Sequence, residues 1–316
     1  MSLDDARGKM EIMAGLPETL DLGALGIDPA AVADVALIHE ANGSAVYRLR
    51  SGRRRMVIKW FADEPEPAEP SSYVLLGTLG VPTLPVYGRS DNVMVLEDLS
   101  FSATWRLATE ADCECAEVGR AVARWYRHLH EVGRELLAKA AAPAFGRREE
   151  DGLDPKTILA MGQKLGLGHL SVWRLCADNI EALKAAIRDL PATLTYNDFH
   201  WSNLAVTHAK VRPVRAVMFD YHLLGIGMAY SDCRNVLSCL RGDGAAAFRQ
   251  AYGPIDEREA ILDAPVSVLV ALKEAASRPR LPRWAEGMVA ALQSGSLELE
   301  QSLHKALEAV QDTGKE

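Results

Sequence analysis

Apolar and polar residues alternate along residues 46–52 and again along residues 53–61, on either side of a polar turn. Alternation with a period of two is typical of half-buried strands, so these residues predict a β-hairpin. Lys59 lies near the end of the second strand, next to Val57 and Ile58. Taken alone, it could be an ordinary strand lysine that points into solvent.

Two short apolar runs, residues 204–206 and 216–219, are separated by a polar turn and predict a second hairpin. Another apolar run, residues 93–96, predicts a strand that leads into the segment Glu97-Asp98-Leu99. Helical patterning prevails in the second part of the chain, where the stretch from Pro143 to Pro155 interrupts it between two long helices.

These elements divide the chain in two. Residues 1–99 read as an irregular lead followed by a small β-rich lobe with one helix. Residues 100–316 read as a larger, mainly helical lobe that holds the second hairpin. We therefore expect an α+β fold with two lobes. The length of 316 residues and the hydrophobic fraction of 48% agree with this size and with a substantial core.

Composition and charge exclude several kinds of partner. The formal net charge of −8 comprises −6 in residues 1–100 and −2 in residues 101–316, and the only basic run is Arg53-Arg54-Arg55, so we expect no nucleic-acid partner. No apolar run reaches roughly 18 residues, and residues 1–5 lack the features of a signal peptide, so we expect a cytoplasmic protein with no membrane partner. Five cysteines without a Cys-x-x-Cys pair argue against a disulfide framework or a zinc knuckle.

The second hairpin carries the residues best suited to chemistry. Asp198 and Asn203, spaced Asp-x-x-x-x-Asn, flank a loop that enters its first strand, and Asp220 ends its second strand. The hairpin would bring all three to one end of a cleft. Phosphoryl transfer from a nucleotide needs a carboxylate that receives the acceptor's proton and oxygen ligands that hold magnesium. The simpler alternative is two strands joined by a polar turn.

Three upstream segments stand in the order that a kinase requires. A turn at Asn42-Gly43-Ser44 would let backbone N–H groups approach a phosphate, although a single glycine also fits a plain hairpin turn. Lys59, if it points inward, can reach the α- and β-phosphates of ATP. Glu97 and Leu99 stand where a linker between lobes would offer backbone groups to an adenine edge, or where a strand simply ends in surface acids.

The ordered set resembles the aminoglycoside phosphotransferase and choline kinase-like family over residues 36–240. Residues 75–82 look like the family's helix before a Gly-Val-Pro turn, and residues 122–130 look like its Leu-His helix. The resemblance implies a two-lobed protein-kinase-like fold with ATP and Mg²⁺ as cofactors. It also implies roles for individual residues: Asp198 as catalytic base, Asn203 and Asp220 as metal ligands, Lys59 as phosphate ligand, and Asp232 as the support beneath the catalytic loop.

The sequence departs from the family pattern at two places around these residues. Tyr196-Asn197 stands where the family has His-Gly, and Tyr221-His222 is an unusual continuation after the metal-binding Asp220. Neither change removes a group that the chemistry requires.

The acidic partner of Lys59 is a third point of departure. Counting back from the Gly-Val-Pro turn indicates Glu69, but Pro70 follows it. Because proline disfavours α conformation in the residue before it and is favoured at the first helical position, we expect Glu69 at a helix boundary. Glu66 or Glu64 could pair with Lys59 instead.

Eleven residues separate Asp220 from Asp232, which leaves no room for the long activation segment of a protein kinase. We therefore expect a small-molecule hydroxyl acceptor. The near-neutral second lobe favours an amino alcohol, a sugar or a simple amino sugar over a polycationic aminoglycoside. A second hypothesis is a degenerate kinase-like protein that binds nucleotide or a partner without catalysis. The sequence leaves open ATP versus GTP and the oligomeric state.

Overall fold

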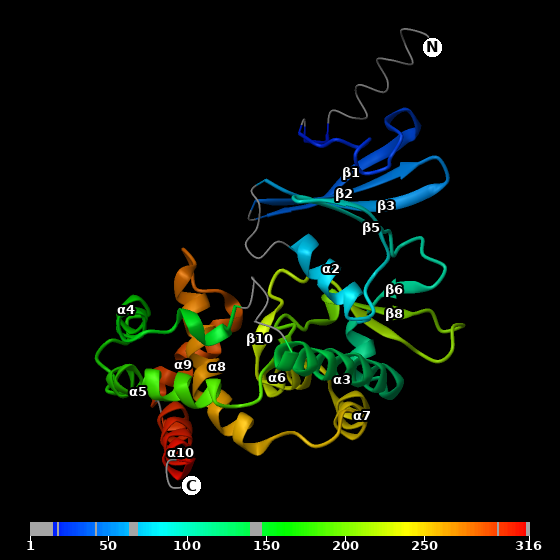
Figure 1. Ribbon diagram of the computed structural model, residues 1–316. Helices are drawn as coiled ribbons and strands as arrows, with labels where there is room; N and C mark the ends of the chain where they lie inside the picture. The colour runs from blue at the N-terminus through cyan, green and yellow to red at the C-terminus, as the bar shows by residue number, and fades with distance from the viewer. Residues whose placement is uncertain are drawn as a thin grey trace. The chain divides into compact units, whose positions relative to one another are not determined.

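The computed structural model describes residues 15–17, 19–41, 43–62, 69–139, 147–295 and 297–313 (Figure 1). Its helices (α), 3₁₀-helices (η) and strands (β) are, in chain order, η1 (Pro29–Ala31), β1 (Val32–Ala41), β2 (Ser44–Ser51), β3 (Arg54–Phe61), α2 (Glu69–Thr78), β4 (Val86–Ser90), β5 (Val93–Glu97), β6 (Trp105–Leu107), η2 (Glu110–Glu114), α3 (Ala116–Lys139), η3 (Glu149–Gly152), α4 (Pro155–Lys164), α5 (Val172–Arg188), β7 (Thr193–Thr195), η4 (Trp201–Asn203), β8 (Leu204–Thr207), β9 (Ala216–Met218), β10 (Gly225–Gly227), α6 (Ala229–Cys239), α7 (Gly242–Tyr252), α8 (Glu257–Ser277), α9 (Arg283–Ser294) and α10 (Leu297–Thr313).

The chain separates into two compact units. The first comprises Met1–His128, Asp198–Leu224 and Val236–Tyr252, and the second comprises Leu129–Asn197, Gly225–Asn235 and Gly253–Glu316. The segment that runs from Asp198 through the second predicted hairpin therefore belongs to the same unit as the N-terminal strands. The lobe boundary after residue 99 stays a prediction.

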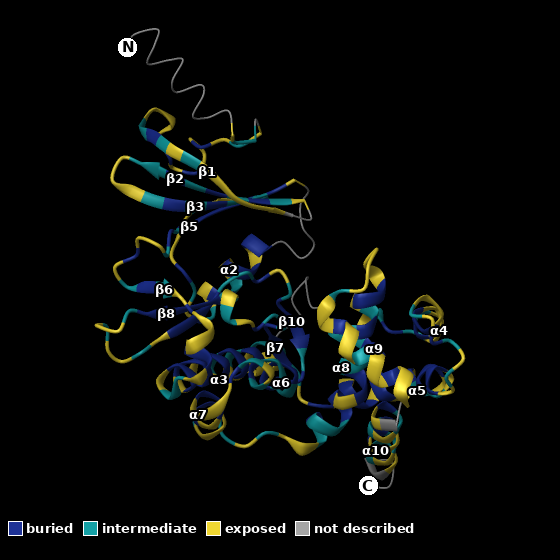
Figure 2. Cartoon of the chain, turned by 180° about the vertical axis from the view of Figure 1, so that it is seen from behind, coloured by how far each residue is buried: buried dark blue, intermediate teal, exposed yellow. Residues whose placement is uncertain are grey.

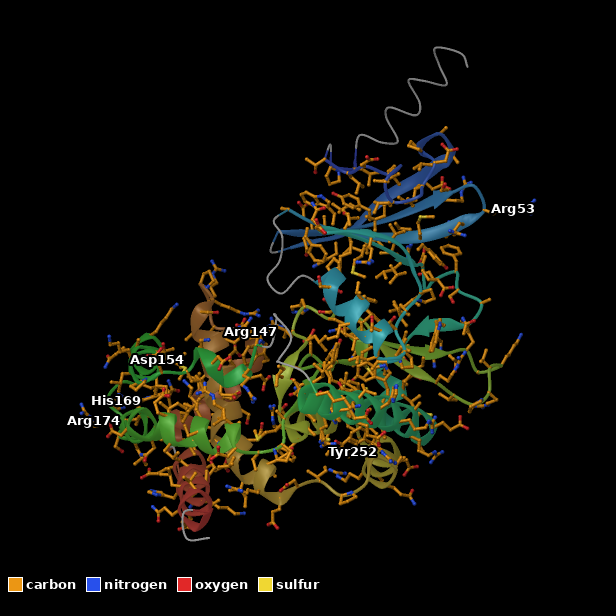
Figure 3. The ribbon with its side chains drawn as sticks, viewed as in Figure 1. Arg53, Arg147, Asp154, His169, Arg174 and Tyr252 are labelled. Carbon is orange, nitrogen blue, oxygen red and sulfur yellow. The ribbon has the colours of Figure 1, made fainter. Side chains whose placement is uncertain are left out.

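A five-stranded antiparallel sheet with the order β1-β2-β3-β5-β4 dominates the first unit. The predicted first hairpin is confirmed, because β2 pairs with β3 from Ser44↔Phe61 to Ser51↔Arg54. The connecting turn uses Gly52 at φ +59°, a conformation that glycine adopts without a steric penalty. Figure 3 shows Arg53 at this turn, extending away from the ribbon.

The buried side chains of this sheet come from alternate positions, as the sequence pattern predicts. Tyr47 and Leu49 of β2 and Met56 and Ile58 of β3 are at most 7% exposed and join one hydrophobic cluster with the preceding segment. Burial of this face fixes the register, since a slip by one residue would turn every apolar side chain toward solvent.

The second predicted hairpin is also present, as β8 and β9. These strands pair from Leu204↔Met218 to Val206↔Ala216, and β6 adds a third strand next to β8. Phe219 continues the pairing with a backbone hydrogen bond to the Asn203 carbonyl at 3.1 Å. The strands are short and wholly buried, so they hold the residues at their ends on a rigid base.

Helices make up most of the second unit, together with the paired strands β7 and β10. Trp173, Ile180, Leu269 and Leu303 are among the buried side chains that α5, α8 and α10 contribute to one core. Figure 2 shows exposed residues along the outer surfaces of α4, α5 and α9. None of the helices in the described ranges is long and apolar enough to cross a membrane.

Candidate active site

The catalytic-loop segment and the β8–β9 hairpin bring Asp198, Asn203 and Asp220 together in the first unit, as the sequence predicts. Asn203 Nδ2 donates hydrogen bonds to Asp198 Oδ2 at 2.7 Å and to the Asp198 carbonyl at 3.2 Å. This leaves the amide oxygen of Asn203 as the atom that could bind a cation. Asp220 follows the strand with φ +64°, a left-handed conformation that is uncommon for residues other than glycine and clusters at functional sites.

Lys59 lies between two carboxylates. Its Nζ is 2.5 Å from Glu69 Oε2 and 2.7 Å from Asp220 Oδ1. Glu69 is 1% exposed and is the first residue of α2, so the expected helix boundary is present and Glu69 does pair with Lys59. Glu64 and Glu66 lie outside the described residues.

Glu69 also holds the residue after Asp220. Its Oε1 accepts the backbone N–H of Tyr221 at 3.2 Å, and the buried Tyr221 ring contacts Tyr73 of α2 edge-to-face at 4.7 Å. A single carboxylate of α2 therefore fixes both Lys59 and the backbone around Asp220.

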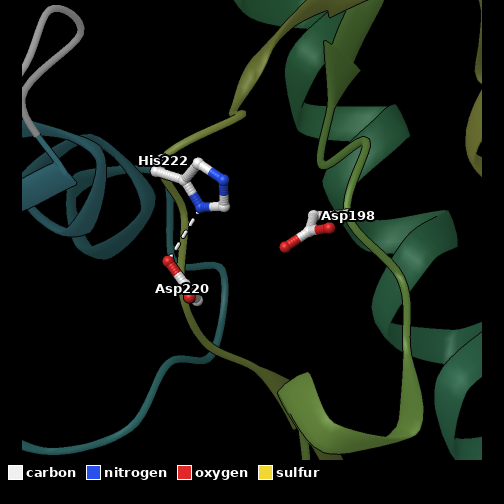
Figure 4. A group of neighbouring side chains, drawn as sticks. All are labelled: Asp198, Asp220 and His222. Carbon is white, nitrogen blue, oxygen red and sulfur yellow. Dashed lines mark hydrogen bonds and ion pairs between the residues drawn. The ribbon is translucent and has the colours of Figure 1, made fainter. Parts of the chain in front are cut away.

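His222 belongs to the same group, although the sequence indicated it only as a departure from the family pattern. Its Nδ1 is 2.8 Å from Asp220 Oδ1. One ligand atom each of Asp198, Asp220 and His222 lie within 4.8 Å of one another (Figure 4). The sequence motif could not predict this residue as part of the site, because the family pattern has no role for a histidine at this position.

The charges of this group follow from burial and from its neighbours. Burial raises the pKa of Asp198, and His222 and Asn203 offset this only in part. Burial also opposes ionisation of Asp220, but the hydrogen bond from His222 and the charge of Lys59 outweigh it and hold the pKa of Asp220 below its usual range. Burial alone would lower the pKa of Lys59, but Glu69 and Asp220 outweigh burial and raise this pKa above its ordinary value. The ammonium group therefore stays charged.

These residues fit a divalent cation. Carboxylate and amide oxygens are the ligands that Mg²⁺ takes in proteins. By formal charge, the three carboxylates of Glu69, Asp198 and Asp220 outnumber Lys59 and a protonated His222 by one, which favours a cation at this group. Of the two predicted metal ligands, Asp220 belongs to this group directly, and Asn203 is linked to it through its hydrogen bond to Asp198.

The predicted nucleotide-binding segments begin or end β2 and β5, the two strands that pair with β3, the strand of Lys59. Gly43 has φ +75° in the turn between β1 and β2, and Ser44 begins β2, whose Val46 pairs with Lys59. Asn42 lies outside the described residues. Glu97 ends β5, and its backbone N–H donates to the Pro85 carbonyl at 3.2 Å.

Leu99 follows in the turn that begins at Asp98. Asp98 is buried and forms an ion pair with Arg48 at 2.7 Å, so it is a structural acid rather than a ligand-binding one. Because the Asp98 side chain is occupied by Arg48, the group near it that could bind an adenine edge is the backbone around Leu99.

Asp232 supports the loop before Asp198, within the second unit. It is fully buried and accepts the backbone N–H groups of Tyr196 and Asn197, each at 2.8 Å. Its Oδ2 also lies 3.1 Å from His130 Nε2, a contact that the sequence did not predict. The predicted support beneath the loop is thus present as hydrogen bonds to two consecutive amides.

Searches by sequence find no match for this chain, either to a protein-family model or to a curated protein. Solved structures do match it. A choline/ethanolamine kinase family protein from Mesorhizobium loti has a TM-score of 0.56 at 14% identity, with 97% of this chain and 99% of that chain covered. An ethanolamine kinase from Plasmodium vivax has a TM-score of 0.53 at 11% identity, with 98% and 93% covered.

A third structure, the AMP-bound complex of a spectinomycin phosphotransferase, has a TM-score of 0.51 at 12% identity, with 95% of this chain and 98% of that chain covered. At such identities the likeness concerns the fold. It confirms the expected architecture: the chain has the α+β, two-lobed, protein-kinase-like fold of choline/ethanolamine kinases and aminoglycoside phosphotransferases.

Proposed function

We propose that this protein is an ATP- and Mg²⁺-dependent phosphotransferase that moves the γ-phosphate to a hydroxyl group of a small molecule. The observation that carries the proposal is the convergence of Lys59, Asp198, Asn203 and Asp220, of which Lys59 and Asp220 are in contact across 161 residues of sequence. A protein that only binds nucleotide has no need of a base beside two metal ligands.

Each side chain has a distinct role in the proposed reaction. Asp198 accepts the proton of the acceptor hydroxyl through Oδ1, since its Oδ2 already accepts from Asn203. Burial moves the pKa of Asp198 upward, toward neutral pH, and a general base is more effective when its pKa lies near the working pH. Lys59 binds the phosphates from β3.

Asp220 and the amide oxygen of Asn203 would hold the magnesium ion, which when bound neutralises the charge that develops on the transferred phosphate. For the nucleotide, Gly43 and Ser44 are the proposed phosphate neighbours, and the backbone near Leu99 is the proposed adenine neighbour. The AMP complex of a protein with the same fold supports a nucleotide at this site.

The acceptor is proposed to be an amino alcohol, a sugar or a simple amino sugar. The short segment between Asp220 and Asp232 and the near-neutral charge of residues 101–316 support a small acceptor with few positive charges. Two proteins with this fold are named as ethanolamine or choline/ethanolamine kinases, which favours amino alcohols. The reaction is proposed to take place in the cytoplasm, in line with free thiols such as Cys113 and Cys239, whose sulfur atoms are 3.6 Å apart.

The test begins with an ATP-consumption screen over amino alcohols, sugars and amino sugars, followed by the variant Asp198→Asn. With the acceptor found, this variant should lose about 100- to 10,000-fold in kcat, the usual contribution of a general base. Its affinity for Mg²⁺ and a non-hydrolysable ATP analogue, measured by calorimetry, should stay near that of the wild type.

Asp91→Asn, in the exposed turn before β5, is the matched control and should leave turnover unchanged. Wild-type turnover in Asp198→Asn would remove Asp198 from the mechanism. Nucleotide binding without acceptor-dependent ATP consumption would favour the degenerate, non-catalytic alternative, which the single glycine of the phosphate turn also favours.

A further inference from the structure

The cluster around Asp220 contains a nitrogen donor as well as oxygen donors. Asp198, Asp220 and His222 each place one ligand atom within 4.8 Å of the others' ligand atoms, and all three belong to the first unit. Figure 4 shows the carboxylate of Asp198 facing the pair formed by Asp220 and His222. The imidazole is thus placed where the proposed function requires a cation.

The backbone around His222 is well anchored. The preceding Tyr221 is fully buried, its hydroxyl donates to the Met218 carbonyl at 2.5 Å, and its N–H donates to Glu69 at 3.2 Å. The His222 side chain itself is 46% exposed, so it is not a packed core residue. A fixed backbone with an accessible ring is the arrangement that a ligand-binding side chain requires.

Stabilisation of Asp220 does not by itself explain this histidine. Asp220 Oδ1 already accepts from Lys59 at 2.7 Å, so the carboxylate has a charged partner without the imidazole. His222 points Nδ1 at Asp220, and in the tautomer that carries its proton on Nε2, Nδ1 is a donor atom for a cation that Asp220 also binds.

The type of donor decides which cations such a site prefers. Magnesium takes oxygen ligands and demands a near-ideal octahedron. Imidazole nitrogen is a ligand of first-row transition ions, whereas carboxylate, carbonyl and water oxygens suit magnesium. A site with one imidazole among carboxylates should therefore favour a transition ion over magnesium.

We propose that His222 supplies a nitrogen ligand to the cation at this site, and that the protein consequently binds Mn²⁺ and similar transition ions more tightly than Mg²⁺. The inference rests on the proposed function in so far as the cation is the one that accompanies the nucleotide. It assigns to His222 a role in cation selection that the proposed ligands Asn203 and Asp220 cannot fill, since they offer oxygen only.

The direct test uses Mn²⁺ as the probe on the full chain with a non-hydrolysable ATP analogue. Protein that carries ¹⁵N-labelled histidine is studied by pulsed electron paramagnetic resonance, which detects nitrogen nuclei bound to Mn²⁺. The wild type should show a ¹⁵N coupling, and His222→Asn should lose it. Asparagine keeps a hydrogen-bond donor for Asp220 but lacks the imidazole nitrogen.

Calorimetry gives the second readout. His222→Asn should weaken Mn²⁺ binding about 10- to 100-fold, the range seen when a group that supports a metal site is removed, and should weaken Mg²⁺ binding less than Mn²⁺ binding. His169→Asn is the matched control, because His169 is an exposed histidine in the loop between α4 and α5 of the second unit. Thermal unfolding without metal establishes that each variant is folded.

The outcomes separate this inference from the proposed function. Mn²⁺ bound with nucleotide but without a histidine coupling, and with equal affinity in His222→Asn, would overturn the role of His222 and leave the phosphotransferase proposal intact. Failure of the wild type to bind either cation with nucleotide would overturn both.

Discussion

At the scale of single residues, Glu69 illustrates what the sequence could and could not predict. Its position at a helix boundary and its pairing with Lys59 follow from the proline after it and from the count to the Gly-Val-Pro turn. Its second hydrogen bond, from the Tyr221 amide, joins residues 152 positions apart, and no local pattern links them. The sequence did not predict His222 as a site residue for a related reason, since its place in the site depends on contacts that only the fold creates.

Asp112 is a residue whose contribution to stability can be measured. It accepts two hydrogen bonds from Arg106, at 2.7 and 2.8 Å, and one from the Thr109 amide at 2.7 Å. Because hydrogen bonds to charged groups are among the stronger ones, Asp112→Asn should lower the free energy of unfolding by about 1.5–3 kcal/mol at neutral pH. Urea unfolding measures this.

The matched control is Asp34→Asn. Asp34 accepts from Arg50 at 2.6 Å, but both side chains are exposed, so the change should cost only about 0–1 kcal/mol. Equal effects of the two substitutions would contradict the view that burial makes the difference.

The effect of Asp112 should depend on pH. Burial opposes its ionisation, but Arg106 and Thr109 outweigh burial and hold the pKa of Asp112 below the ordinary value of about 3.9. The ionised carboxylate therefore stabilises the fold at pH values above the ordinary pKa of Asp. This stabilisation is lost as the pH falls through the lower pKa of Asp112 in the folded state. The difference between wild type and Asp112→Asn should shrink in unfolding measurements below about pH 4.

At the scale of secondary structure elements, hairpins were the most predictable feature. Alternating residues predicted β2–β3 and the apolar runs predicted β8–β9, because one buried face imposes a period of two. Contacts between helices were not predictable in this way. Gly119 of α3 and Gly244 of α7 approach so closely that a Cβ on Gly119 would lie 2.1 Å from the Gly244 carbonyl oxygen.

This close approach gives a prediction with an internal control. Gly119→Ala should destabilise the protein by about 1–3 kcal/mol, because a backbone atom has to move to admit the methyl group. Gly287→Ala, in the exposed part of α9 with nothing within 4 Å, should instead stabilise it by roughly 0.5–1 kcal/mol. Thermal and urea unfolding distinguish the two, and a neutral Gly119→Ala would mean that α3 and α7 can separate freely.

At the scale of the whole molecule, the sequence predicted the α+β kinase-like fold because its signals are ordered along the chain. The packing of the helices after residue 153 could not be predicted from the sequence. In this part of the chain, α10 buries Leu299, Leu303 and Ala306 against the α5–α8 core. Helical periodicity reveals an apolar face but not the helix that covers it.

Ligand binding should be visible as stability of the whole protein. A nucleotide with Mg²⁺ should raise the melting temperature with concentration, since a ligand that binds only the folded state stabilises it by mass action. Asp220→Ala should abolish the metal-dependent part of the shift, and Asn203→Ala should reduce it. Unchanged metal-dependent shifts in both variants would refute their assignment as ligands.

The contact between Lys59 and Asp220 implies that phosphate and cation help each other to bind. Without ligands, Lys59 and Asp220 are paired at 2.7 Å, and each offsets part of the other's charge. A phosphate that draws Lys59 away exposes the carboxylate to the cation, and a cation on Asp220 releases the ammonium group for the phosphate. The two ligands are therefore coupled reciprocally. Each melting shift can be expressed as a stabilisation free energy, measured with phosphate alone, with the cation alone and with both. The coupling free energy is the stabilisation with both minus the sum of the two single stabilisations. A purely additive response would show that Lys59 and Asp220 serve their ligands independently.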